Sequence, residues 1–76
     1  MSLGPETAVT FRLEIEQEQD GRWLAEVPEL PGVLAYGTSP EEARARAQAL
    51  ALRVVADCLE HGEAGPDLRS ISFASA

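Results

Sequence analysis

The sequence predicts a small α+β domain, a two-layer β-β-β-α-β fold with one helix on one face of a four-stranded sheet. Apolar and polar residues alternate with a period of two in two early segments and again near the C-terminus. Between these segments, apolar residues follow helical spacing over residues 40–61. A helix between strands most simply joins neighbouring parallel strands through a right-handed crossover. With the longest strand at the centre, the expected strand order is 3-2-1-4.

The first two strands should form a hairpin, over Val9–Glu16 and Arg22–Val27. In the first strand the odd-numbered residues are apolar and the even-numbered residues are polar, which is typical of one buried face. Facing residues of an antiparallel pair lie on the same side of the sheet, so a two-residue turn would place Ile15 opposite Glu26. A three-residue loop, 19–21, instead places Ile15 opposite Ala25 and requires Gly21 in a left-handed conformation.

The third strand is expected over Val33–Tyr36, after a corner made by two prolines three residues apart. Gly37 should end this strand. The fourth strand is expected over Leu68–Ala74, with Ile71 and Phe73 turned inward.

The helix should begin at Pro40, with Ser39 as its N-cap and Glu42 as the far half of a capping box. It should end at about His61, with Gly62 as its C-cap glycine. One apolar stripe is expected to pack on the sheet: Ala43, Ala47, Leu50, Ala51, Val54 and Cys58. A second apolar set falls outside that stripe: Ala45, Leu52, Val55, Ala56 and Leu59.

The composition describes one small acidic domain of 76 residues, with 13 Asp and Glu against 6 Lys and Arg and a net charge of -7. We expect residues 1–7 to be a flexible leader and residues 8–76 to form the single domain. Acidic chains suit basic protein partners better than phosphate backbones, so we expect no direct nucleic-acid binding. No apolar run approaches the ~20 residues of a membrane span, so a cytoplasmic protein is expected.

Two segments carry a resemblance to a known family. Residues 26–32 read E-x-P-x-L-P-G, and residues 37–43 read G-x-[ST]-x-E-E-A before an alanine-rich helix. Together they resemble the HicB-like antitoxin family, over about Phe11 to Gly62. The resemblance implies a partial ribonuclease-H-like fold and a small basic HicA-like ribonuclease toxin as partner, whose active site the antitoxin masks. Fuller members carry a C-terminal DNA-binding domain; because this chain stops at Ala76, we expect the short form.

Two other functions remain open. Glu14, Glu16 and Glu26 share the polar sheet face, which allows a vestigial or minimal metal-dependent nuclease. Glutamates on an open face are more typical of a solvated surface, so we expect no enzyme activity, no metal and no cofactor. The other alternative is a stand-alone oligomeric protein with an unrelated ligand. Cys58 is interpreted as a small buried apolar group and His61 as a helix-capping residue.

A partner or oligomer interface is expected from apolar residues that a single pair of layers leaves exposed: Leu24, Leu34, Tyr36, Leu52, Val55 and Leu59. Because so small a domain is marginally stable alone, we expect a homodimer or a higher even oligomer. One route uses the helix, and Leu52→Glu should then give a monomer. The other uses the edge of the third strand, and a proline at Leu34 should then dissociate the assembly.

Overall fold

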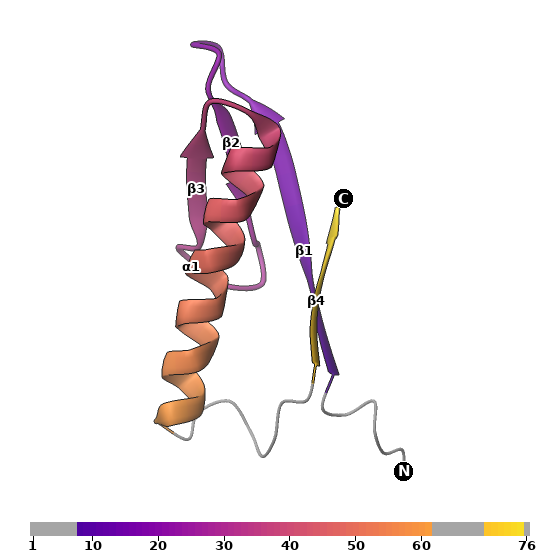
Figure 1. The fold of residues 1–76 in the computed structure, drawn as a ribbon, viewed down its shortest axis with the longest axis vertical. Helices are drawn as coiled ribbons and strands as arrows, with labels where there is room; N and C mark the ends of the chain where they lie inside the picture. Colours follow the sequence, from indigo (N-terminus) through magenta and orange to yellow (C-terminus); the bar gives the residue numbers. More distant parts are fainter. Residues whose placement is uncertain (1–7, 62–69, 76) are drawn as a thin grey trace.

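A computed structural model of the chain describes residues 8–61 and 70–75. The elements in chain order are β1 (Ala8–Gln17), β2 (Trp23–Glu26), β3 (Leu34–Gly37), α1 (Pro40–Glu60) and β4 (Ser70–Ser75). The sheet order is β3-β2-β1-β4, and α1 covers one face (Figure 1). The two-layer α+β fold and the predicted order 3-2-1-4 are therefore confirmed. The predicted leader, the C-cap Gly62 and the start of the predicted fourth strand lie outside the described residues.

β1 is the strand that joins the two parts of the sheet, and its two halves pair with different neighbours (Figure 1). Residues 8–13 pair in parallel with β4, and residues 14–17 pair antiparallel with β2. Leu13 and Glu14 therefore mark the junction at which β1 passes from one neighbour to the other. The sheet is stepped, because β2 and β4 lie along different halves of the strand between them.

The hairpin between β1 and β2 has the predicted register. Ile15 lies opposite Ala25, and the Glu18 N–H donates to the Arg22 carbonyl at 2.7 Å, which closes a three-residue loop. Gly21, the last loop residue, has a φ of 93°, the left-handed conformation that this loop length demands. The prediction made from the parity of the apolar pattern is thus confirmed.

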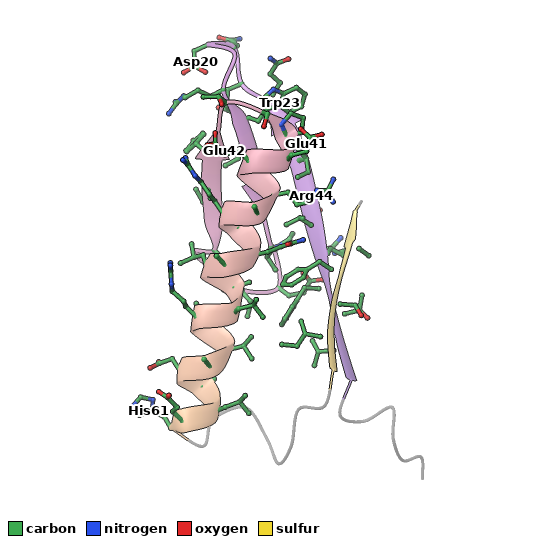
Figure 2. The ribbon with its side chains drawn as sticks, viewed as in Figure 1. Asp20, Trp23, Glu41, Glu42, Arg44 and His61 are labelled. Carbon is green, nitrogen blue, oxygen red and sulfur yellow. The ribbon has the colours of Figure 1, made fainter. Side chains whose placement is uncertain are left out.

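The start of α1 is fixed by the predicted cap and by one contact that differs from the prediction. Ser39 Oγ accepts a hydrogen bond from the Glu42 N–H at 3.1 Å, as an N-cap should. Glu42 Oε1, however, accepts from the N–H of Thr38 at 2.6 Å and from its Oγ1 at 3.0 Å. The carboxylate reaches one residue further back than the Ser39 N–H of a capping box, so that part of the prediction is wrong. Figure 2 shows Glu42 at this end of the helix.

The Glu42 carboxylate should make the stability of the domain depend on pH. The pKa of Glu42 lies below its ordinary value because the Thr38 N–H and hydroxyl bond to the carboxylate and Arg46 lies beside it. A carboxylate whose pKa is lowered by folding stabilises the folded protein at pH values above its ordinary pKa. This stabilisation is lost as the pH falls through the lowered pKa. We expect Glu42→Gln to reduce the fall in Tm between about pH 7 and about pH 3.

The control for this experiment is Glu41→Gln, because Glu41 precedes Glu42 in the first turn and the structure gives it no hydrogen bond or ion pair among the described residues. Its Tm should follow that of the parent across the same pH range. Asp20 and Glu29 also have lowered pKa values, so the Glu42 variant should keep part of the dependence. The pKa of Asp20 is lowered by hydrogen bonds from Arg22; that of Glu29 is lowered, against the opposing effect of desolvation, by hydrogen bonds from its own backbone N–H and from Arg12. Identical curves for Glu42→Gln and the parent would contradict the prediction.

The core lies between α1 and the sheet, and alanines form most of the helix surface within it. The fully or nearly fully buried residues are Phe11, Leu13, Ala25, Val27, Val33, Ala43, Ala47, Ala51 and Val55. Small side chains on α1 allow the helix backbone to lie close to the sheet. Leu50 and Val54 are partly buried against this core, as predicted, and Cys58 is half-buried.

Val55 corrects the predicted division of the helix surface. It is 8% exposed and belongs to the core, whereas the sequence pattern placed it among residues left for a partner. The buried positions of α1 follow each other at intervals of four residues, from Ala43 to Val55. Such a row is inclined to the helix axis, so the buried face moves around the helix toward its C-terminal end. A stripe drawn parallel to the axis therefore misses Val55.

The C-terminal end of α1 is close to the predicted one. The last helical residue is Glu60, and the backbone N–H of His61 donates to the Asp57 carbonyl at 3.1 Å. His61 Nδ1 lies 2.8 Å from the same carbonyl oxygen and 3.4 Å from Asp57 Oδ1. The imidazole therefore caps the helix end, at the far end of α1 from Glu42 (Figure 2).

Candidate protein interface

The face of the sheet opposite α1 carries the even-numbered side chains of β1, β2 and β3. The register places six of them in two rows across the three strands: Glu16–Leu24–Tyr36 and Glu14–Glu26–Leu34. We call this surface of six residues the open face. Leu34 is 42% exposed and Tyr36 is 37% exposed, while Leu24 is half-buried between its neighbours. Apolar side chains therefore lie toward β3 and carboxylates toward β1.

Arg22 lies against the apolar side of the open face. Its guanidinium carbon lies 4.3 Å from the centroid of the Tyr36 ring, within the range of a cation–π contact. Arg22 Nε also donates to Asp20 Oδ2 at 2.7 Å, and the Arg22 N–H donates to Asp20 Oδ1 at 3.0 Å. The hairpin loop thus positions one cation beside the ring, and the aliphatic part of the open face stays exposed.

The carboxylates of the open face differ in their surroundings. Arg12 Nη1 lies 3.6 Å from Glu14 Oε2, so the charge of Glu14 is partly compensated. The same arginine is tied to Glu29, which accepts from the Arg12 N–H and from Nε, each at 3.1 Å. The structure gives Glu16 and Glu26 no ion pair within residues 8–61 and 70–75. Their negative charge is therefore available to a basic partner.

The glutamates of the open face do not gather into a metal-binding group within the part of the chain that the structure describes. Glu14 and Glu26 lie directly opposite each other, which brings together two of the three glutamates considered for a nuclease. No group of three or more His, Cys, Asp or Glu in the described part of the chain has an arrangement that could hold a metal ion. The sheet here also presents no pocket in which two-metal chemistry could be shielded from water.

The remaining predicted interface residues lie on α1. Leu52 is 45% exposed and Leu59 is 40% exposed, and their spacing of seven residues places them on the same side of the helix. This outer side of α1 lies off the buried row of the helix, which runs from Ala43 to Val55, so it is a surface separate from the open face of the sheet. The six predicted residues thus divide into three on the open face, two on α1 and Val55 in the core.

The edge of β3 is partly occupied by a contact that the sequence did not predict. The Val27 N–H donates to the Val33 carbonyl at 3.0 Å. From Val33 onward into β3, the odd-numbered residues therefore point their backbone groups toward β2. Tyr36 therefore points its backbone groups outward, and its carbonyl accepts from Arg46 Nη1 at 3.0 Å. A charged side chain over an edge hinders pairing with another strand. No local sequence pattern indicates this contact, because it joins α1 to β3.

Comparisons of the chain with protein-family models, with curated proteins and with solved structures find no match. Among the elements that the structure describes, α1 included, no helix combines the length and apolar character needed to cross a membrane. The described residues present four surfaces on which a partner could bind: the open face, the outer side of α1, and the β3 and β4 edges of the sheet.

Proposed function

We propose that the chain is a HicB-like antitoxin or a stand-alone relative. It acts as a cytoplasmic protein-binding module that neutralises a small basic HicA-like ribonuclease toxin by masking its active site, and it contributes no catalysis. The observation that carries the proposal is the open face, where exposed Leu34 and Tyr36 share rows with Glu26 and Glu16. The described residues give these two carboxylates no ion pair. The resemblance of residues 26–32 and 37–43 to the family motifs supports the same partner.

The chemistry of the open face fits the active site of such a toxin. A protein that cleaves RNA must attract phosphates, so its active site is surrounded by Lys and Arg. Glu16 and Glu26 would meet those cations, and charge complementarity of this kind raises the association rate and selects the partner. Tyr36 and the leucines supply the apolar contact area from which most binding energy arises.

The test uses two leucines that are almost equally exposed on opposite sides of the domain. Leu34→Lys places a cation on the open face, where it would face a basic partner, and Leu52→Lys places the same cation on α1. We expect Leu34→Lys to weaken toxin binding at least about tenfold, because the cation repels the partner and is desolvated at the contact. Leu52→Lys should bind as the parent does.

The test requires a short basic reading frame beside the gene of this chain, and the product of that frame serves as the partner protein. Binding is measured by calorimetry, and neutralisation by growth of cells that express both proteins. If that basic protein neither arrests growth nor binds the parent chain, the proposal is wrong. If binding is lost in Leu52→Lys and kept in Leu34→Lys, the binding surface is α1 and not the open face.

A further inference from the structure

β4 forms one edge of the described sheet, and its sequence contains nothing that prevents pairing with another strand. Residues 70–75 read SISFAS, without a charged residue or a proline. Natural sheets protect such edges with charges, prolines or very short strands. The opposite edge has these features, because β3 has four residues and the Arg46 guanidinium occupies its Tyr36 carbonyl. β4 has six residues and lacks them.

The register shows which backbone groups of β4 point outward. The Glu18 N–H bonds to Arg22, so even-numbered residues of β1 direct their backbone groups toward β2 and odd-numbered residues toward β4. Phe11 lies opposite Phe73 in the parallel pair. In a parallel ladder, the backbone N–H and C=O of Phe11 bond to the residues on either side of Phe73, which are Ser72 and Ala74. The N–H and C=O groups of Ile71 and Phe73 therefore point away from β1, at the free edge.

The side chains of the same two residues are only partly covered. Ile71 and Phe73 lie on the helix side of the sheet and are half-buried; the Phe73 ring centroid is 5.9 Å from that of Phe11. α1 packs mainly against β2 and β3, and the sheet order places β4 beyond β1 from these two strands. The edge that offers backbone groups is thus also the place where apolar side chains lack a full cover.

We propose that β4 pairs antiparallel with β4 of a second copy of this chain, so that two four-stranded sheets join into one. Facing residues must share a side of the sheet, which allows a two-fold register with Ser72 opposite Ser72 of the second copy. In this register Ile71 lies opposite Phe73 of the second copy, and Phe73 opposite its Ile71. Each of these pairs exchanges two backbone hydrogen bonds and joins an aromatic to a β-branched side chain.

A second copy suits this edge because its own β4 is the same uncharged segment, so the contact brings no charged residues of β4 together. Two chains of net charge -7 repel each other, and the repulsion is smallest where the contact lies on a neutral segment. Residues 70–75 are such a segment, whereas the open face carries three glutamates. The proposed dimer does not depend on toxin binding, because pairing at β4 leaves Leu34, Tyr36 and the carboxylates uncovered.

Charge variants at Ser72 test the pairing, with sedimentation velocity over a series of protein concentrations as the measurement. The parent should dimerise as its concentration rises. Ser72→Lys and Ser72→Glu should each remain monomeric, because two like-charged side chains would face each other across the two-fold axis with their Cβ atoms about 5 Å apart. A mixture of the two variants should form a heterodimer, which shows that both are folded and that the charges face each other.

Thr10→Lys is the matched control. Thr10 lies beside Ser72 on the same side of the sheet, is exposed like Ser72, and belongs to β1, one strand in from the edge. Lysines at this position would be about 14 Å apart in the dimer, three strand spacings, so Thr10→Lys should dimerise as the parent does. A dimer that persists in both Ser72 variants, or a parent that is monomeric at every concentration, would overturn the proposal.

Amide hydrogen exchange of the parent gives a second measurement that needs no variant. The outward N–H groups of Ile71 and Phe73 should become more protected as the protein concentration rises, because pairing gives them acceptors. The Ser72 N–H, which points toward β1, should change less. Exchange at Ile71 and Phe73 that is independent of concentration would contradict the proposed contact.

Discussion

Alanine in place of Gly37 is expected to destabilise the domain by about 2–3 kcal/mol. Gly37 is buried at the end of β3, where the strand meets the first turn of α1. A Cβ at this position would lie 2.6 Å from the Ala43 nitrogen and 3.0 Å from both the carbonyl carbon and the Cβ of Glu42. Backbone atoms cannot rotate away as a flexible side chain can, so β3 and α1 would have to separate.

The control for Gly37→Ala is Gly32→Ala, and both are measured by urea denaturation. Gly32 has a φ of 87°, and an added Cβ there would meet nothing within 4 Å. Its substitution should cost about 1–2 kcal/mol, from the left-handed conformation alone. The two glycines thus separate steric contact from backbone strain. If Gly37→Ala unfolds at the same urea concentration as the parent, the close approach of β3 to α1 does not limit stability.

The close packing at Gly37 gives a physical reason for the residue types found in the motif of residues 37–43. Gly37 permits the close approach, Ser39 caps the first turn, and Glu42 binds Thr38. Ala43 is fully buried, and its backbone nitrogen is the atom nearest to where a Cβ at position 37 would lie. Residues 37–43 therefore turn the end of β3 into the first turn of α1 over a short distance.

The fold was predictable from the sequence where the pattern depends on short-range backbone geometry. A strand has a side-chain period of two, so the alternation around Ile15 determined both the loop length and the facing residue Ala25. The cap at Ser39 depends on residues within one helical turn. The open-face positions of Leu24, Leu34 and Tyr36 follow from the same period.

The features that were not predictable depend on contacts between distant elements. The Glu42 carboxylate accepts from the Thr38 N–H because of the path of the chain from β3 into α1. Arg46 on α1 donates to the Tyr36 carbonyl on β3. Val55 is buried because the contact of α1 with a twisted sheet is inclined to the helix axis. Whether the β4 edge is free likewise depends on how much of the sheet α1 covers, and the sequence of β4 alone does not indicate this.

Leu13→Ala is the other substitution expected to have a large effect, a destabilisation of about 3 kcal/mol. Leu13 is fully buried and lies at the junction of β1, where pairing with β4 ends and pairing with β2 begins. Removing its side chain leaves a cavity beneath both pairings, so neither half of the sheet can close it without disturbing the other. A domain of 76 residues has a total stability of roughly 4–11 kcal/mol, so this loss is a large part of it.

Leu52→Ala is the matched control for Leu13→Ala, since it removes the same atoms from a side chain that is 45% exposed on α1. We expect its unfolding free energy, measured with urea at a concentration where the chain is monomeric, to lie within about 0.5 kcal/mol of that of the parent. Equal losses for the two variants would contradict a core centred on β1. A much larger loss at Leu13 would show that the buried side chain at the junction of β1 contributes far more to stability than the same side chain exposed on α1.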